Sequence, residues 1–380
     1  MKNILIAALC FASPILAQDG AHLSLKLEMQ QTIKKGNAYL LSKQHAEGYW
    51  GNPELPAFTA LTLRSLLSDP SLNLKKPLPE NYTKGLTWLI AQQQKNGGIY
   101  SIGLATYNTA SSIMALMAAD PVKYKVPILK ARAFLVNQQT DWGVKGELDS
   151  EFDGGIGYGG SYDHSDLSNT HLALEALYHT RTLATDAGEK KQPELDWAAA
   201  LEFVTKCQNL QETNKGDKAG NDGGFVYFPG NSKAGEDVSE DGKIALRSYG
   251  SMSYAGLLSL VYSDLTADDP RVKTVITWLS KNFTLKENPG LGGQGLFYYY
   301  HVMAKTLAAA HLPTLDGPGG KKIDWRSELS TKVLSSQRED GSWINETSRW
   351  MENEPILVTC YAVMTLEQIH RTFPLKADSN

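Results

Sequence analysis

The sequence predicts an all-α fold in which six helix hairpins close into an α/α toroid, also called an α6/α6 barrel. A six-residue pattern recurs along the chain, a glycine-rich turn follows each copy, and a run of small and apolar residues with helical period follows each turn. Each repeat is therefore predicted to be a helix, a tight turn and a second helix that returns beside the first.

The recurring pattern marks the first helix of each hairpin. It reads Lys-Gly-x-x-Tyr-Leu at 35–40, Lys-Gly-x-x-Trp-Leu at 84–89 and Lys-Ala-x-x-Phe-Leu at 130–135. A glutamine follows four residues after each copy, at Gln44, Gln93 and Gln139. Three degenerate copies keep, in turn, Phe203 with Gln208, Trp278 with Leu279, and Val333 with Gln337.

The turns and the second helices follow in the same order. The six turns lie at 47–54, 96–103, 153–160, 222–229, 290–297 and 340–347. Glycine supplies the positive φ and the close backbone approach that such turns need. The second helices are expected at 57–67, 106–118, 167–179, 248–262, 297–310 and 355–369. Their small residues suit a closely packed inner layer and the charged first helices suit an outer one, so we expect about twelve helices in two concentric layers.

The composition indicates a globular protein, and the N-terminal segment indicates that it is exported. The chain has 380 residues, of which 42% are hydrophobic and 21% charged, and its net charge is −4. Interspersed charges leave no basic footprint for nucleic acid. Lys2, the apolar run 4–16 and Ala17 are typical of a signal peptide over 1–17, too short for a stable membrane span. We expect cleavage near Ala17, export to the periplasm or the medium, and one toroid domain over 18–380.

The motifs of several common enzyme sites are absent from the sequence. It contains no Cys-x-x-Cys, His-Glu-x-x-His, Gly-x-x-x-x-Gly-Lys or Gly-x-Ser-x-Gly string. Cys207 and Cys360 lie in apolar helical patterns and are expected to be buried free thiols. We therefore expect neither a metal site nor a cofactor.

The first repeat carries a family resemblance. Its string Lys35-Gly36-x-x-Tyr39-Leu40-x-x-x-Gln44-x-x-x-Gly48-x-Trp50 resembles the QW motif of triterpene cyclases such as squalene-hopene cyclase, and Gln337-x-x-x-Gly341-x-Trp343 matches the second half of that motif. The resemblance covers essentially the whole chain after the signal and implies the superfamily of terpenoid cyclases and protein prenyltransferase β-subunits. In that family the glutamine caps a helix end and the aromatic ring stacks on the next repeat. The resemblance therefore implies structural roles for Gln44, Trp50, Gln337 and Trp343.

The reaction does not follow from the fold, because such toroids serve several chemistries. Triterpene cyclases protonate an alkene with an Asp-x-Asp-Asp motif, which this sequence lacks, and they join two toroids where this chain has one. Asp163 and Asp166 precede the third inner helix and are the substitute acids, although Asp166 fits a helix N-cap better than a proton donor. Prenyltransferase β-subunits hold a zinc ion through carboxylate and thiolate ligands. Leu246 and Ser248 fall near the positions of these ligands and cannot bind zinc in the same way.

The candidate ligand contacts lie near the end of the ring where the glycine turns meet the inner helices, which we call the mouth. They are Arg247, Tyr249, Tyr254, Tyr298, Tyr299, Trp350 and Glu354, and His301 joins Asp163 and Asp166 as a candidate catalytic residue. Tyr298, His301 and Lys305 share one helical face. We expect Tyr254, Tyr298, His301 and Asp166 to line one connected cavity. Aromatic side chains there would stabilise a carbocation or stack on a sugar ring.

Two functions therefore stay open at this point. One is a terpene-cyclase-like enzyme, an isomerase or lyase, that acts on an isoprenoid or another apolar ligand inside the ring. The other is a non-catalytic or carbohydrate-directed toroid that binds a glycan or a protein at the mouth. A filled ring centre, in which tyrosine hydroxyls only satisfy buried polar groups, also fits the pattern.

Overall fold

Two kinds of helix build the protein, and their burial patterns separate them into layers. In α9 (Gly250–Tyr262) every residue except Val261 is buried. In α3 (Glu80–Ala91) the buried residues are Tyr82, Gly85, Leu86 and Leu89, which is the spacing of a single helical face. A helix that is buried all round belongs to an inner layer, and a helix with one buried face covers it from outside.

The computed structural model describes residues 14–159, 164–186, 192–238 and 242–373. Its inner helices are α2 (Ala57–Ser68), α4 (Ala105–Ala119), α6 (Leu167–His179), α9, α11 (Leu296–Ala309) and α13 (Pro355–Thr372). The outer helices are α1 (Pro14–Ser42), α3, α5 (Lys125–Val136), α8 (Trp197–Lys206), α10 (Pro270–Lys281) and α12 (Trp325–Leu334). Smaller elements are α7 (Arg181–Thr185), η1 (Pro318–Gly320), η2 (Arg349–Met351), β1 (Glu236–Val238), β2 (Ile244–Leu246), β3 (Leu315–Asp316) and β4 (Lys322–Ile323).

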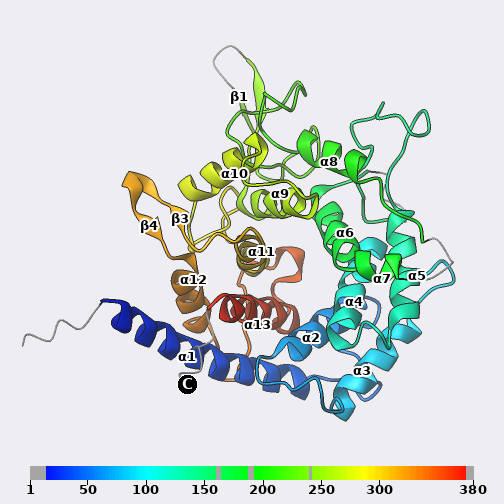
Figure 1. Ribbon diagram of the computed structural model, residues 1–380, viewed down its shortest axis with the longest axis vertical. Helices are drawn as coiled ribbons and strands as arrows, with labels where there is room; N and C mark the ends of the chain where they lie inside the picture. The colour runs from blue at the N-terminus through cyan, green and yellow to red at the C-terminus, as the bar shows by residue number, and fades with distance from the viewer. Residues whose placement is uncertain (1–13, 160–163, 187–191, 239–241, 374–380) are drawn as a thin grey trace, which may run out of the picture.

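The inner helices close into a ring, as Figure 1 shows in a view along the shortest axis. Each inner helix packs against the next one in chain order, and α13 packs against α2. The outer layer meets in the same way, because α12 contacts α1. The predicted α/α toroid of six hairpins is therefore confirmed.

Glutamine side chains tie five of the six hairpins to the following one. The Nε2 atom of Gln44 donates to the carbonyl oxygens of Gly48 in its own turn and of Asn81 at the start of α3. Gln93, Gln139 and Gln208 make the same pair of hydrogen bonds. Gln337 donates to Gly341 and, across the closure of the ring, to Thr32 of α1. These bonds satisfy carbonyl groups at the turns and hold neighbouring repeats in register.

The turn glycines allow a close approach that a side chain would prevent. A Cβ atom on Gly48, Gly97, Gly154 or Gly341 would lie 2.0–2.8 Å from a backbone carbonyl oxygen of the next outer helix. All four have φ between +82° and +104°. The turns are therefore fixed both by backbone conformation and by contact with the neighbouring repeat.

In the first and last repeats a tryptophan of the turn packs inside the hairpin. Trp50 and Trp343 are fully buried, and their Nε1 atoms donate to the carbonyls of Leu40 and Val333. Their backbone N–H groups donate to hydroxyls of the inner helices, Thr59 and Thr359 respectively. A Cβ atom on Gly85 of the next repeat would lie 2.7 Å from the Trp50 ring. Tryptophan, glycine and threonine thus form one packed joint.

The fifth repeat is fixed to its neighbour by different residues. It has Asn288 in the turn, whose side chain accepts from Ser251 N–H and donates to Ser251 Oγ and to the Gln294 carbonyl. Asn288 therefore hydrogen-bonds to α9, which precedes it in the chain, rather than to the outer helix that follows it.

Three further expectations concern the rest of the chain. Cys207 and Cys360 are buried free thiols, as predicted. In the part of the chain that the structure describes, none of the helices is both long and apolar enough to cross a membrane. Residues 1–13, which include most of the predicted signal, lie outside the described residues.

Candidate functional site

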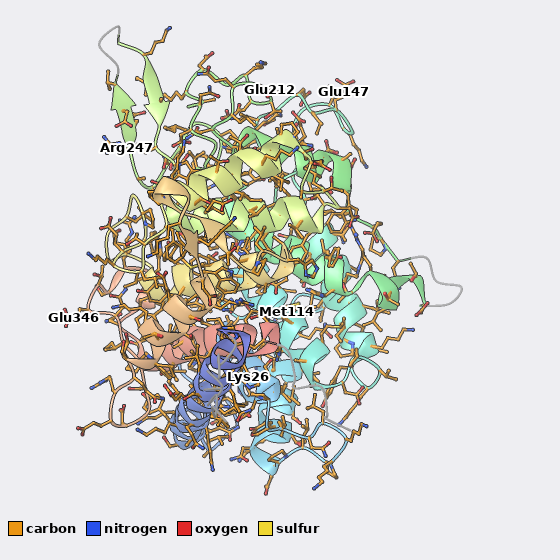
Figure 2. The ribbon with its side chains drawn as sticks, turned by 60° about the vertical axis from the view of Figure 1, so that its left-hand side comes forward. Lys26, Met114, Glu147, Glu212, Arg247 and Glu346 are labelled. Carbon is orange, nitrogen blue, oxygen red and sulfur yellow. The ribbon has the colours of Figure 1, made fainter. Side chains whose placement is uncertain are left out.

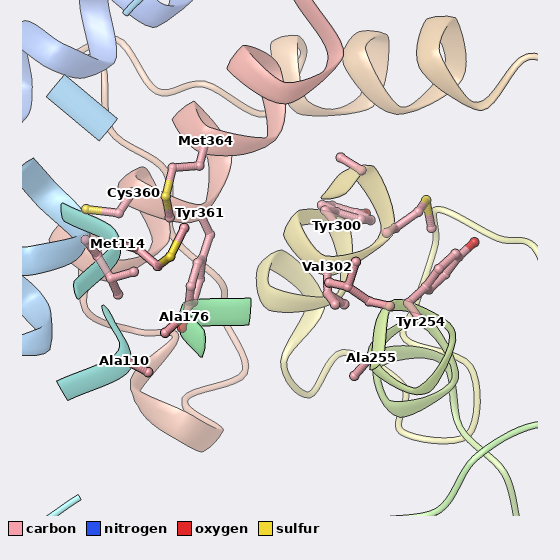
Figure 3. Packing of buried hydrophobic residues seen from close by; sticks show 14 of the residues in the cluster. Ala110, Met114, Ala176, Tyr254, Ala255, Tyr300, Val302, Cys360, Tyr361 and Met364 are labelled. Carbon is pink, nitrogen blue, oxygen red and sulfur yellow. The ribbon is translucent and has the colours of Figure 1, made fainter. Parts of the chain in front are cut away.

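A small cavity lies between the inner helices on the axis of the ring. Its volume is about 20 Å³, which is room for roughly one water molecule. The apolar and aromatic side chains of its wall are those of Leu61, Tyr107, Ala110, Met114, Leu172, Val302 and Tyr361. Its polar lining consists of Arg64, Ser111, His171, Glu175, Tyr298, His301 and Lys305. Figure 3 shows Ala110, Met114 and Tyr361 gathered on one side of this space and Val302 on the other.

A buried ion cluster closes the cavity at the end away from the mouth, and we call it the floor. Glu175 of α6 accepts from Arg64 of α2 at 2.9 Å and from Lys305 of α11 at 2.6 Å. The side chains of Glu175 and Lys305 are 1% and 8% exposed. Burial by itself would raise the pKa of Glu175, but the two cations, Lys305 foremost, hold that pKa well below its usual range. Glu175 is therefore a carboxylate shared by two cations.

Two neutral histidines line the cavity above the floor. His171 Nδ1 lies 2.7 Å from the Ser168 carbonyl, which only accepts, so Nδ1 carries the proton and Nε2 faces the Tyr298 hydroxyl at 3.5 Å. Burial, with Lys305 adding to it, lowers the pKa of His171 to about 4. Burial also holds the pKa of His301 well below its usual range, and its Nδ1 is buried without a hydrogen-bond partner.

Three tyrosines form the aromatic wall. The hydroxyls of Tyr107 and Tyr361 lie 2.9 Å apart, and the Tyr361 ring contacts those of Tyr298 and His301 at centroid distances of 5.8 and 5.7 Å. The His301 and Tyr361 rings are nearly parallel, at 22°. These side chains come from α4, α11 and α13. The wall can therefore pack against an apolar chain and still offer hydroxyl groups to it.

The sequence-predicted residues divide into those that line this cavity and those that do not. Tyr298 and His301 line it together with Lys305, as their shared helical face predicts. Tyr254 and Asp166 are absent from its lining. The expectation that Tyr254, Tyr298, His301 and Asp166 share one cavity is therefore met by only two of the four residues.

Three of the predicted tyrosines instead pack between helices. Tyr254 and Tyr299 are buried with their rings 5.7 Å apart, and the Tyr299 hydroxyl donates to the Thr284 carbonyl. Tyr254 lies apart from the group of Ala110, Met114 and Tyr361 in Figure 3. Tyr249 is the buried residue before α9 and donates its N–H to Phe225. Tyr254 and Tyr299 miss the cavity because of their angular position around each helix. They point from α9 and α11 toward each other and away from the axis of the ring.

The remaining predicted contacts lie at the surface. The Arg247 guanidinium pairs with Asp237 at 2.5 Å beside the β1–β2 hairpin, which projects from the body of the protein in Figure 2. Trp350 is 42% exposed at the rim, where its ring lies over Gly295. Glu354 is exposed at the start of α13 and makes no side-chain capping bond.

Asp166 is the N-cap of α6, as its position before the third inner helix indicates. Its Oδ1 accepts from Asn169 N–H at 2.9 Å and its Oδ2 from Asn169 Nδ2 at 2.8 Å. Burial raises the pKa of Asp166 to about 6, and the hydrogen bonds from Asn169 limit the rise. Asp163 lies outside the described residues.

Sequence reasoning did not single out Arg64, Glu175, His171, Tyr107 and Tyr361. The sequence did contain a signal for the charged members, because no other Asp, Glu, Lys or Arg stands in the inner-helix run of Arg64 or in that of Glu175. A charge in the middle of a helix that is buried all round must meet a partner. The sequence did not show that these partners come from three different helices.

Glu352 positions one wall of the cavity. It is 1% exposed, and its carboxylate accepts from the N–H groups of Phe297 and Tyr298 and from Asn345 Nδ2. A side chain from the last repeat thus caps α11 at the turn that carries Tyr298. Among the described residues no cluster of three or more histidine, cysteine or carboxylate side chains has the geometry to hold a metal ion.

Comparisons with known proteins identify the fold. No family model matches the chain, and no curated protein matches it. Among solved structures, the type II terpene cyclase MstE from Scytonema in its apo form matches with a TM-score of 0.51 at 13% identity, over 92% of this chain and 99% of that one. Single-site variants of MstE match with TM-scores of 0.51: one with its product merosterolic acid A (14% identity, 92% and 99% covered) and one with its substrate geranylgeranyl dihydroxybenzoate (13%, 92% and 100%). At this identity the likeness shows the terpene-cyclase fold.

Proposed function

We propose that this protein is a terpene-cyclase-like toroid that takes an isoprenoid or another apolar ligand into the central cavity. The observation that carries the proposal is the cavity itself, which lies on the ring axis and has a wall of Leu61, Met114, Tyr107 and Tyr361. A terpene cyclase of the same fold has a geranylgeranyl compound as its substrate. We further propose that the chain acts in the exported compartment, after loss of residues 1–17.

A ligand of isoprenoid size needs the cavity to widen, and strained backbone at the mouth would favour this widening. A second small pocket adjoins the cavity through Leu61 and Tyr107, and Leu104 and Met351 line it. Leu104, Trp350 and Met351 have φ of +47°, +57° and +63°, which is unfavourable for bulky side chains. Such strain is stored at functional sites, and relaxing it lowers the cost of opening the rim.

Asp166 does not line the cavity, so as the proposed acid it would act through neighbours that reach the cavity. Its raised pKa keeps a fraction of it protonated near neutral pH. Ser168, two residues further on, interacts with Tyr298, which lines the cavity. Asp166→Asn is expected to lower turnover of an isoprenoid by about a hundredfold, the usual contribution of a general acid, while ligand affinity changes less than about twofold. Wild-type turnover is expected to fall as the pH rises through 6, since only the protonated form donates.

The matched control for this experiment is Asp196→Asn. Asp196 is also a helix N-cap, and its side chain accepts from Ala199 N–H in the same way. Turnover and melting temperature are measured for both variants. Equal losses of thermal stability with unchanged turnover would make Asp166 a helix cap only, and would favour a toroid that binds a ligand, a glycan or a protein without catalysis.

A further inference from the structure

The floor of the cavity carries a charge that the described residues do not balance. Arg64 and Lys305 are two cations, and both are bound to the single carboxylate of Glu175. His171 and His301 are neutral, because burial lowers the pKa of each. Glu367 of α13 is the other buried carboxyl that interacts with Arg64, and burial holds its pKa well above the usual range, so it stays protonated. One positive charge is therefore in excess.

Lys305 carries the more deeply buried part of this excess charge, because its side chain is 8% exposed and that of Arg64 is 20% exposed. Burying an ion is unfavourable unless protein groups replace the water molecules that it loses. Among the described residues, Lys305 Nζ donates one hydrogen bond, to Glu175, although an ammonium group offers three donors. His301, one turn before Lys305 on the same face of α11, has a buried Nδ1 with no partner. Both residues line the cavity.

We propose that this floor binds the carboxylate of an amphiphilic ligand, with Lys305 and Arg64 as its counter-charges, and that the apolar chain of the ligand runs toward the mouth past Leu61 and Tyr107. The proposal rests on the proposed function and names its substrate class and orientation. A monoanion balances the single excess charge. A carboxylate also needs less widening of the cavity than a phosphate or diphosphate, which brings more charge and more bulk.

The direction of the ligand follows from the gradient of polarity along the cavity. The floor is charged, the middle is aromatic, and the pocket that adjoins it at the mouth is lined by Leu55, Phe58, Met351 and Leu357. An acid that entered chain first would bury its carboxylate among these apolar side chains. Head-first binding places each part of the ligand against matching groups.

Calorimetric titration of the full chain with three probes tests the proposal: geranylgeranoic acid, geranylgeraniol, which has the same chain and a neutral head, and palmitate, which has the same head and a straight chain. The acid is expected to bind at least about tenfold more tightly than the alcohol. Lys305→Met is expected to remove this tenfold preference and to leave the affinity for the alcohol unchanged. Lys305→Arg, which keeps the charge, is expected to retain the preference.

The controls separate a ligand site from a structural ion pair. Lys273→Met removes an exposed lysine paired with Asp268 and is expected to change nothing. The ligand-free melting temperature of Lys305→Met is expected to equal or exceed that of the wild type, because Glu175 keeps Arg64 and the excess charge is gone. A lower melting temperature together with an unchanged preference for the acid would make the cluster structural and overturn the proposal.

The remaining outcomes distinguish this inference from the proposed function. Equal affinities of the acid and the alcohol would overturn the carboxylate inference and leave the isoprenoid function standing. Binding of palmitate that depends on Lys305, with no binding of either isoprenoid, would keep the carboxylate site and overturn the isoprenoid function. Failure of both acids to bind would overturn the inference.

Discussion

Trp50→Ala is expected to lower the free energy of unfolding by about 3–5 kcal/mol, the usual cost of removing a buried large aromatic side chain. The Trp50 side chain is fully buried between the first two hairpins. The substitution leaves a cavity against Gly85 and removes the hydrogen bond from Nε1 to the Leu40 carbonyl at 2.6 Å. Trp343→Ala is expected to behave alike, because Trp343 makes the same contacts across the closure of the ring.

Urea denaturation of the two variants measures this loss. Trp142→Ala is the control, since Trp142 is 41% exposed and its replacement is expected to cost less than about 1 kcal/mol. The variants that still fold are expected to keep the wild-type affinity for a cavity ligand. Full stability together with lost ligand binding would mean that these tryptophans belong to the site and are not structural.

Gly154→Ala is expected to destabilise the protein by about 3 kcal/mol or more, as the sum of two effects. Gly154 has φ of +82°, where an L side chain is strained. The new Cβ would lie 2.0 Å from the carbonyl oxygen of Ala199 in α8, and neither backbone segment can move without breaking the turn. The contact adds overpacking to the strain of the left-handed conformation.

Gly146→Ala separates these two effects. Gly146 has almost the same φ, +84°, but a Cβ there would meet nothing within 4 Å. Its replacement is therefore expected to cost about 1–2 kcal/mol, the strain alone. Thermal unfolding of both variants gives the difference. Equal losses at the two positions would show that the approach of the turn to α8 contributes nothing to stability.

The repeats were predictable because each one depends on contacts within itself and with the next. The glutamines, turn glycines and tryptophans recur at fixed spacing, and their hydrogen bonds follow the same spacing. The inner helices accordingly begin and end within two or three residues of the predicted positions, for example 106–118 for α4 (Ala105–Ala119). The fifth repeat departs from the pattern, and its Asn288 binds back to Ser251 in the preceding repeat.

The candidate site was less predictable, because it depends on how far each inner helix is rotated about its own axis. Tyr254 and Tyr298 both lie near helix starts, yet Tyr298 faces the cavity and Tyr254 faces Tyr299. The floor joins Arg64, Glu175 and Lys305, which are 111 and 130 residues apart in the chain. Spacing along one helix predicted the shared face of Tyr298, His301 and Lys305, but it contains no information about partners on other helices.

The central claim is that an apolar ligand binds inside the ring, and equilibrium binding of geranylgeraniol to the wild type and to Ser111→Phe tests it most directly. Ser111 of α4 lines the cavity and is buried, so a phenylalanine there would occupy the space into which the cavity must widen to admit a ligand, without changing the outer surface. We expect one molecule to bind per wild-type chain and the affinity of Ser111→Phe to fall at least about tenfold, with its fold retained by circular dichroism. Unchanged affinity in Ser111→Phe, or no binding to the wild type, would contradict the claim.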